Sequence, residues 1–333
     1  MRGLLVGYGS AGRRHLAHFH ALGVTDWTVV RSGRGTLAFQ PPCAVRVVPD
    51  LEAAFALGHH DFAVVANPSA FHVATATACI GAGCHLLIEK PLATSLDALG
   101  AIEHAVRAAD RRVLVGFQFR GHPAVDRIAG LVRDGRIGRV LRAELSWGEY
   151  LPDWHPWESY RAGYAARVEL GGGVHHTLCH PVDLALRWFG PPRAVTADLV
   201  CNGPLGLEVA ESAEAWLEWD GGLRAVIHLD YWRRPGGLRV ELLGTDGSLE
   251  WDYPAGTLRV RDSAGNLPID EPLPGVAERE ALFAEQARHF LAVVAGAEPP
   301  RSSLRDGMDA ARVTLGMEAS ARRRCTLHLA DHP

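Results

Sequence analysis

The sequence predicts an α/β protein of two domains, one over residues 1–120 and one over residues 121–333. In the first part, short apolar runs alternate with helical patterns, which is typical of a parallel sheet with crossover helices. A glycine-rich turn closes the first apolar run. Beyond Pro123, apolar and polar residues alternate with period two and hairpin turns recur, which indicates an α/β domain with a large, mostly antiparallel open sheet.

In the first domain, each apolar run has the length of a strand and leads into a helical pattern. We expect strands at Leu4–Gly7, Trp27–Val30, Phe62–Ala66, Leu86–Glu89 and Val113–Phe117. We expect helices at Ser10–Leu22, Leu51–Ala56, Ala70–Ala82 and Leu96–Ala109. Gly81 and Gly83 stand at the end of the third helix, where glycine is the usual terminator.

In the second domain, a helix at Ala124–Arg133 precedes an alternating run that begins at Val140. Further strands are expected at Ala213–Trp219, Leu223–Trp232, Leu238–Leu243 and Ser248–Tyr253, and two closing helices at Glu278–Ala295 and Asp306–Arg323. A large antiparallel sheet needs a cover on its second face, and self-association supplies one. We therefore expect a homodimer or homotetramer.

Composition excludes several classes of protein. The 333 residues are 47% hydrophobic and 22% charged, as in ordinary globular proteins, and the net charge of −4 leaves no basic footprint for nucleic acid. The six cysteines form no CxxC pair, so we expect reduced thiols in a cytoplasmic protein. No signal peptide precedes the first strand and no apolar stretch approaches a membrane span, so no membrane partner is expected.

The turn Gly7-Tyr8-Gly9-Ser10-Ala11-Gly12 is a GxGxxG between a predicted strand and a predicted helix. That context makes it a dinucleotide fingerprint and the first domain a Rossmann domain. Gly7 permits the tight turn, Gly9 lets backbone approach a pyrophosphate, and Gly12 permits close packing of helix and strand. Ser10 and Ala11 open the helix, whose free N–H groups face the phosphates.

The end of the second strand predicts which cofactor binds. NAD enzymes usually carry Asp or Glu there for the ribose 2′-hydroxyl, whereas this chain has Arg31, Ser32 and Arg34 and no acid. Two arginines are suited to clamp a 2′-phosphate with bidentate bonds, so NADP(H) is preferred and NAD(H) is a lesser possibility. The alternative is a basic loop that is simply solvated.

Glu89-Lys90-Pro91 follows the strand predicted at Leu86–Glu89, at the edge where open α/β sheets bind ligands. The ammonium of Lys90 is suited to stabilise charge that develops on a substrate oxygen. Pro91 fixes the backbone, and the Lys90–Pro91 bond is a candidate for the cis form.

Taken with other motifs, the chain resembles the Gfo/Idh/MocA oxidoreductases, the family of glucose–fructose oxidoreductase and inositol dehydrogenase. The resemblance spans nearly the whole chain. Its motifs are Gly7–His15, Asn67-Pro68, Glu89-Lys90-Pro91, Gln118-Phe119-Arg120 with His122-Pro123, and Gly171-Gly172-Gly173 with His180 and Asp183. It implies nicotinamide-dependent hydride transfer on sugars or cyclitols, and a substrate domain whose open sheet mediates dimers or tetramers.

In this resemblance, Lys90 matches the catalytic lysine and His180 the catalytic histidine. We expect one helix to begin near Gly171–Gly173 and to carry His176, His180 and Asp183 on one face, at i, i+4 and i+7. Many members of the family carry an aspartate one turn before the histidine, where this chain has Thr177 or His176. Histidine alone can serve as acid or base, because its pKa lies near operating pH.

His176, Cys179 and His180 also have the spacing of helical metal ligands. A zinc site needs further ligands and supporting hydrogen bonds that the sequence does not identify, so we expect no metal. His175 is expected to be a packed or surface histidine.

The segment Tyr150–Arg161 is rich in aromatic residues and prolines. Aromatic faces suit the apolar faces of a sugar ring, although the segment is also readable as a structural loop buried by its own aromatics. It resembles a branch of the family found with surface-polysaccharide and nonulosonate genes, which implies a sugar or sugar-nucleotide substrate.

These considerations predict the sites as follows. The expected catalytic residues are Lys90, His180, Thr177 and His176. Cofactor contacts are expected from Gly7, Gly9, Ser10, Ala11, Gly12, Arg31, Ser32, Arg34, Asn67, Pro68, His72, Glu89 and Lys90. Substrate contacts are expected from Arg120, Trp154, Tyr160, Arg161, Tyr164, His176 and Asp183. Two other functions stay open: reduction of a non-sugar imine or carbonyl, and non-catalytic regulation through a bound nicotinamide nucleotide.

Overall fold

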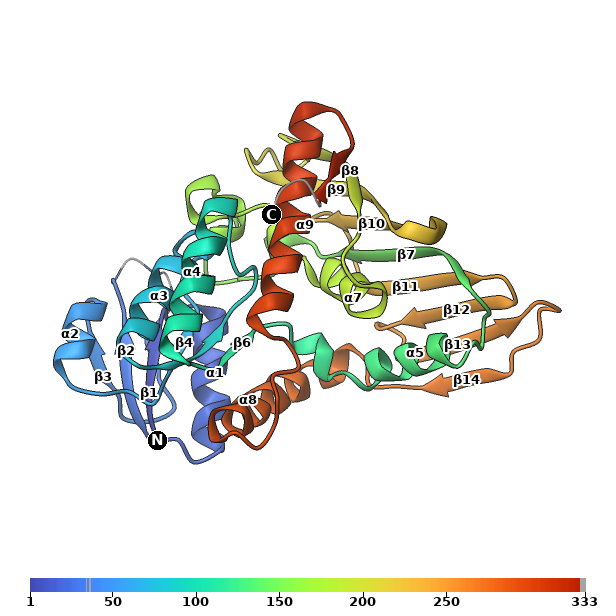
Figure 1. The fold of residues 1–333 in the computed structure, drawn as a ribbon. Helices are drawn as coiled ribbons and strands as arrows, with labels where there is room; N and C mark the ends of the chain where they lie inside the picture. The colour runs from blue at the N-terminus through green and yellow to red at the C-terminus, as the bar shows by residue number, and fades with distance from the viewer. Residues whose placement is uncertain (34, 36, 330–333) are drawn as a thin grey trace. The chain divides into compact units, whose positions relative to one another are not determined.

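The computed structural model describes residues 1–333 apart from residues 34, 36 and 330–333 (Figure 1). The chain divides into two compact units. The first unit comprises residues 1–118, 169–171 and 281–311, and the second comprises residues 119–168, 172–280 and 312–333. The first boundary lies close to the expected one, but the sequence did not predict that residues 281–311 return to the first unit.

The first unit contains a fully parallel six-stranded sheet in the order β3-β2-β1-β4-β5-β6. The strands are β1 (Arg2–Val6), β2 (Asp26–Val30), β3 (Arg46–Val48), β4 (Phe62–Val65), β5 (His85–Ile88) and β6 (Val113–Val115). The helices between them are α1 (Ser10–Ala21), α2 (Leu51–Ala56), α3 (His72–Gly81) and α4 (Leu96–Ala109), of which α3 and α4 lie side by side. This arrangement confirms the Rossmann prediction.

Two local expectations for the first unit were wrong. Strand β3 was missed because it is a three-residue edge strand in which Arg46 interrupts the valines and Val47 is exposed, so it has no buried pattern to mark it. Helix α3 was expected from Ala70, but a 3₁₀ turn at Ser69–Phe71 precedes it.

An aromatic cluster explains why helix α8 (Arg279–Ala295), late in the chain, contributes to the first unit. Phe290 of α8 meets Phe19 of α1 and Phe62 of β4, with ring centroids 5.9 Å and 5.5 Å away. Trp27 of β2 completes the cluster at 5.5 Å from Phe62. Such long-range burial of large rings leaves no local trace in the sequence, which is why both closing helices were expected in the second domain.

The second unit holds a nine-stranded sheet in the order β14-β13-β12-β11-β7-β10-β9-β8-β15, antiparallel except for the β7–β10 pair. Its strands are β7 (Val140–Gly148), β8 (Ala194–Cys201), β9 (Ala210–Glu218), β10 (Arg224–Asp230), β11 (Gly237–Gly244), β12 (Gly247–Asp252), β13 (Thr257–Asp262), β14 (Ile269–Pro272) and β15 (Leu327–His328). Its helices are α5 (Pro123–Arg133), α6 (Val174–Thr177), α7 (His180–Phe189) and the end of α9 (Leu304–Arg323). The predicted mostly antiparallel sheet is confirmed, although β8 and β13–β15, which lie toward its edges, were not predicted.

The single helix expected after the triple glycine is wrong. The chain forms two helices, α6 and α7, separated by Leu178 and Cys179. Pro181 lies in the first turn of α7 and has no N–H to donate to the carbonyl of Thr177, so the helical ladder is interrupted there. His176 therefore does not share one continuous helix face with His180 and Asp183.

A buried ion pair holds the start of α7. Asp183 is fully buried and receives hydrogen bonds from Nε and Nη2 of Arg120, the latter at 2.7 Å from Oδ1. Arg120 lies in a 3₁₀ turn at Gln118–Gly121, just before α5. The pair thus joins two segments about sixty residues apart in the sequence.

None of the helices in the described ranges is long and apolar enough to cross a membrane.

Removal of one member of the Arg120–Asp183 pair is expected to be costly. Asp183→Asn should lower the free energy of unfolding by about 3–5 kcal/mol, because it leaves a buried charge without its counterion. Asp126→Asn is the matched control, since its ion pair with Arg187 is exposed and should contribute about 1 kcal/mol or less. Urea denaturation of both variants measures the difference; equal losses would show that the buried pair does not stabilise α7.

Candidate active site

The glycine turn after β1 has the geometry that the sequence predicted. Gly7 has a φ of +95°, and a Cβ there would lie 2.6 Å from the carbonyl oxygen of Ala66. A Cβ on Gly12 would collide with the carbonyl oxygen of Gly7, so only glycine lets α1 start this close to the strand. Gly9 caps α1 without a side-chain bond and faces open space. The backbone N–H groups that start α1 are therefore accessible to an anion.

The loops after β4 and β5 are joined by His72. Its Nδ1 lies 2.7 Å from the carbonyl oxygen of Pro91, and its Nε2 lies 2.8 Å from that of Asn67. The peptide bond between Lys90 and Pro91 is cis. His72 was expected to contact the cofactor; its ring is buried between these two loops, where it holds Asn67 and the Lys90–Pro91 segment in place.

Asn67 offers a polar atom to a ligand. Its Nδ2 donates to Thr75 Oγ1 at 2.8 Å, but its buried Oδ1 has no hydrogen-bond partner among the described residues. A buried acceptor left unpaired is costly unless a ligand satisfies it. With the exposed helix start at Gly9, this atom makes the carboxyl edge of the sheet suitable for a nicotinamide dinucleotide.

Lys90 stands at the carboxyl end of β5, beside a buried carboxylate. Glu89 accepts a hydrogen bond from the buried His15 of α1, with 2.6 Å between Oε1 and Nε2. Burial raises the pKa of Glu89, but the hydrogen bond and charge of His15, together with the charge of Lys90, outweigh burial and hold it below the ordinary value. Glu89 therefore fixes α1 and presents negative charge next to Lys90; Lys90 itself is partly exposed.

The basic loop after β2 is only partly described. Arg31 follows β2 and its Nη2 donates to the carbonyl oxygen of Leu37 at 3.2 Å, while its guanidinium lies over the ring of Phe39. Ser32 is exposed. Arg34, the second arginine expected at the 2′-phosphate, lies outside the described residues.

In the second unit, Thr177 ends α6 and is bound to a buried tyrosine. The Thr177 hydroxyl donates to the carbonyl oxygen of Gly173 at 3.1 Å and forms a second hydrogen bond with the hydroxyl of Tyr231. Burial raises the pKa of Tyr231 well above its ordinary value, so this phenol stays protonated. Because Thr177 has one proton and directs it at Gly173, the geometry favours a positioning role for Thr177 over proton transfer. Nothing in the sequence pattern singled out Tyr231.

His180 is the first residue of α7 and lies in an aromatic setting. Its ring stacks on Trp147 of β7, with centroids 5.1 Å apart and planes at 24°. Phe119 packs against the same ring at 5.2 Å. The imidazole is thus held in a fixed orientation, as proton transfer requires.

His176 and His180 lie on different helices, α6 and α7. It is 4% exposed and burial lowers the pKa of its ring to about 4, so it is neutral at pH 7. Arg120 and Asp183 are bound to each other in the interior. For Arg120 and Asp183, the geometry favours a structural role over the substrate contacts that the sequence suggested.

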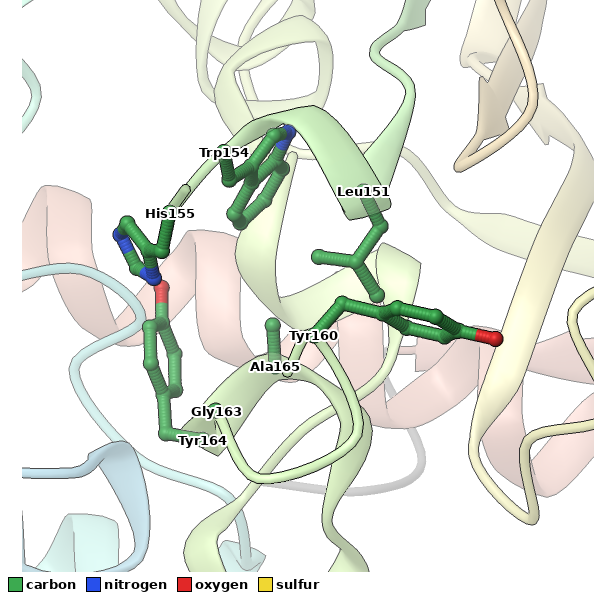
Figure 2. Close-up of a pocket in the computed structure, with 7 residues that line it drawn as sticks. All are labelled: Leu151, Trp154, His155, Tyr160, Gly163, Tyr164 and Ala165. Carbon is green, nitrogen blue, oxygen red and sulfur yellow. The ribbon is translucent and has the colours of Figure 1, made fainter. Parts of the chain in front are cut away.

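The aromatic segment encloses a small pocket (Figure 2). The pocket is lined by Leu151, Trp154, His155, Tyr160, Gly163, Tyr164 and Ala165. The buried indole N–H of Trp154 has no acceptor among the described residues. In Figure 2 the ring of Tyr164 points toward His155 and the hydroxyl of Tyr160 points away from Trp154.

Two residues of this segment form hydrogen bonds with another loop. The Tyr160 hydroxyl donates to the carbonyl oxygen of Leu205 at 3.3 Å. Arg161 donates to the carbonyl oxygens of Leu205 and Gly206 at 2.5 Å and 2.9 Å. These bonds anchor the segment to the loop between β8 and β9, and the Arg161 guanidinium also lies over the Tyr160 ring.

The sequence and fold were compared with known proteins. Residues 1–117 match the family model described as the oxidoreductase family, NAD-binding Rossmann fold, and residues 125–250 match the GFO/IDH/MocA C-terminal domain. The myo-inositol dehydrogenase Hyg17 of Streptomyces leeuwenhoekii is 27% identical over 95% of this chain and 96% of that protein. Two other curated oxidoreductases, from Bacillus subtilis and Synechocystis, are 28% and 30% identical, but the chain matches only 30% and 36% of their lengths.

Among solved structures, the WlbA dehydrogenase from Bordetella pertussis, in complex with NADH and UDP-GlcNAcA, superimposes with a TM-score of 0.80. The superposition covers 98% of this chain and 96% of that chain, at 21% sequence identity, which shows a shared fold. Both family models point the same way as the glycine turn and the motifs at Lys90 and His180. The chain belongs to the Gfo/Idh/MocA family of oxidoreductases.

Proposed function

We propose that this protein is an NADP(H)-preferring oxidoreductase that transfers hydride to or from a carbon of a sugar, sugar nucleotide or cyclitol. One observation carries the proposal: Gly7, Asn67 and Lys90 follow β1, β4 and β5, three adjacent parallel strands. Carboxyl ends of parallel strands share one edge of a sheet, so a dinucleotide site and a reactive lysine lie on the same edge.

The cofactor would be held by the residues of that edge. The N–H groups at the start of α1 would receive the pyrophosphate, and Asn67 Oδ1 would accept a hydrogen bond. The cofactor supplies the hydride acceptor or donor when bound.

Preference for NADP(H) follows from charge. No acidic residue follows β2 to receive a ribose 2′-hydroxyl, and Arg31 stands there. A guanidinium has five N–H donors, so its contact with Leu37 leaves donors for a 2′-phosphate. The WlbA structure contains NADH, whereas the scyllo-inositol 2-dehydrogenase IolW of Bacillus subtilis is named for NADP(+), so proteins similar to this chain use either nucleotide.

The proposed chemistry divides between two residues. The Lys90 ammonium would stabilise negative charge on the substrate oxygen. His180, oriented by Trp147 and Phe119, would give a proton to that oxygen during reduction or take it during oxidation. Thr177 and Tyr231 would hold the segment that precedes α7 and need not touch the substrate.

The aromatic segment and the named substrates of similar proteins favour a sugar-like substrate. The buried indole N–H of Trp154 would donate to a substrate hydroxyl. Hyg17 is named as an inositol dehydrogenase and the WlbA structure contains a sugar nucleotide, which fits the same substrate class.

The nine-stranded sheet supports self-association. Trp216 of β9 is 49% exposed, and its neighbours across the sheet are Val226 of β10 and Thr196 of β8. Leu243 of β11 is 47% exposed. An open sheet face with exposed large apolar side chains is suited to meet a second copy of the chain.

The first prediction concerns the cofactor. Wild-type protein should bind NADPH more tightly than NADH, and Arg31→Asp should weaken NADPH by about 10- to 100-fold, since a hydrogen bond to a charged group contributes about 1.5–3 kcal/mol. Binding of NADH should change little. Nucleotide fluorescence titration measures both affinities. Arg46→Ala is the control, because Arg46 begins β3 and so lies away from the carboxyl ends of the strands. Equal affinities in the wild type would overturn the assignment of the 2′-phosphate.

The second prediction concerns catalysis. Lys90→Ala and His180→Ala should each lower turnover by on the order of 10²-fold or more while leaving NADPH affinity nearly intact, because both act on the reacting oxygen. His176→Ala should lower it less, and the exposed His59→Ala should not. Steady-state rates on a panel of keto-sugars and cyclitols measure turnover, and parallel titrations with NADPH measure cofactor affinity. Full turnover in His180→Ala would assign the proton transfer to another group.

The third prediction concerns assembly. Light scattering at micromolar concentration should show a dimer or tetramer of the 36.0 kDa chain, because an obligate interface buries about 2,000 Å² or more. Trp216→Glu, which places a charge on the open sheet face, should shift the protein toward monomer, whereas Val276→Glu, another exposed apolar position outside the sheet, should not. A wild-type monomer would refute the proposal.

A further inference from the structure

Two adjacent histidines and a glutamate converge in the second unit, and no part of the proposed chemistry uses them together. His175 and His176 lie on α6, and Glu318 lies on α9. Each offers one atom able to bind a metal ion, and these atoms lie within 4.8 Å of one another. Within the described residues, this set contains neither Cys179 nor His180, so it differs from the triple that the sequence spacing suggested.

The histidines of this set have unmet polar atoms. Both ring nitrogens of His175 and the Nδ1 of His176 are buried with no hydrogen-bond partner among the described residues. His175 is 5% exposed and His176 4%, and their ring centroids are 4.0 Å apart. Buried polar atoms in folded proteins are nearly always paired, so an exception calls for a ligand or another role.

The protonation state of the pair suits metal binding. Burial lowers the pKa of His176 to about 4, and burial and then the neighbouring His176 lower that of His175 well below its ordinary value. Both rings are therefore neutral at pH 7, and neutral imidazole is the form that binds metal ions.

We propose that His175, His176 and Glu318 form a binding site for a divalent ion of the zinc class, which ties α6 to α9. Two imidazole nitrogens and one carboxylate oxygen are a ligand set that zinc accepts, whereas magnesium and calcium prefer oxygen ligands throughout. Tetrahedral zinc with bonds of about 2.0–2.2 Å needs ligand atoms roughly 3.3–3.6 Å apart. The three ligand atoms lie within 4.8 Å of one another, so each pair closes by at most about 1.5 Å on binding.

The site has a structural meaning for the rest of the molecule. Helix α6 lies between the Gly171–Gly173 turn and α7, whose first residue is His180. An ion that fastens α6 would restrain the segment leading to His180 without touching the substrate. His176 would then act as a ligand of the ion, which accounts for its burial better than a role in proton transfer.

The test measures zinc binding without cofactor or substrate, so it is independent of the proposed enzymatic function. The full chain is treated with a chelator, dialysed, and titrated with ZnCl₂ against a chromophoric competitor, with MgCl₂ in parallel. All proteins compared, the parent included, carry Cys201→Ser and Cys325→Ser, because both cysteines are exposed thiols that can bind zinc adventitiously. Thermal unfolding is recorded with and without zinc, since an ion that binds only the folded state raises the midpoint.

Three variants separate the site from its surroundings. Glu318→Gln removes the carboxylate while keeping its size. His175→Leu removes both imidazole nitrogens and substitutes an apolar side chain. His228→Gln is the matched control, because His228 is another histidine between two carboxylates, Glu214 and Asp230, on the sheet.

The expected result is one zinc ion per chain, a midpoint raised by zinc but not by magnesium, and affinity at least about tenfold weaker in Glu318→Gln and His175→Leu, since each lacks one of three ligands. His228→Gln should bind as the parent does. Without zinc, His175→Leu should unfold at or above the parent's midpoint, because it removes buried polar atoms that lack partners. Absence of zinc binding, or equal binding in Glu318→Gln and the parent, overturns the proposal.

Discussion

The close approach of α1 to the turn after β1 is the constraint on which the cofactor edge depends. Any side chain at Gly12 would collide with the Gly7 carbonyl, and any at Gly7 would meet the backbone after β4. With both positions bare, the start of α1 lies against the carboxyl ends of the strands. His15, one turn further along α1, then reaches Glu89 after β5. Helix α1 is therefore tied both to the turn after β1 and to the residue that precedes Lys90.

A comparable constraint acts in the second unit, where a proline divides what would otherwise be one helix. The break at Leu178 and Cys179 separates α7 from α6 and makes His180 an N-terminal residue of its helix. The Arg120–Asp183 pair and the rings of Trp147 and Phe119 hold that start. A rigid setting of this kind suits a proton-transferring histidine, since misplacement by about an ångström is costly in catalysis.

The buried polar groups fall into two kinds. Asp183, Thr177 and His72 have their hydrogen bonds satisfied inside the protein, and they position loops and helices. Asn67 Oδ1, the Trp154 indole nitrogen and the ring of His175 do not, within the described residues. Other buried atoms of the described residues, such as Trp251 Nε1 and Ser302 Oγ, also lack a partner, but these three lie at the proposed cofactor edge, the aromatic pocket and the proposed ion site.

Features whose cause is local could be predicted from the amino-acid sequence alone. The GxGxxG turn, the strands of the parallel sheet except β3, the hairpins β9–β10 and β11–β12, and the motifs around Lys90 and His180 were all readable, because turns, alternation and glycine spacing act over a few residues. Family membership followed from those motifs. Exposed edge strands such as β3 and β14 escaped, since they carry no buried pattern.

Contacts between groups far apart in the sequence became apparent only in the folded protein. The return of Phe290 to the first unit, the pairing of Arg120 with Asp183, the bond between Thr177 and Tyr231, and the convergence of His175 with Glu318 each join segments far apart in the chain. Helical spacing predicted that His176 and His180 share one helix face, but Pro181 lacks the N–H that a continuous helix would need. His176 lies instead near Glu318 of α9. Such outcomes depend on packing and on which buried polar atoms find partners, and neither is encoded by local spacing.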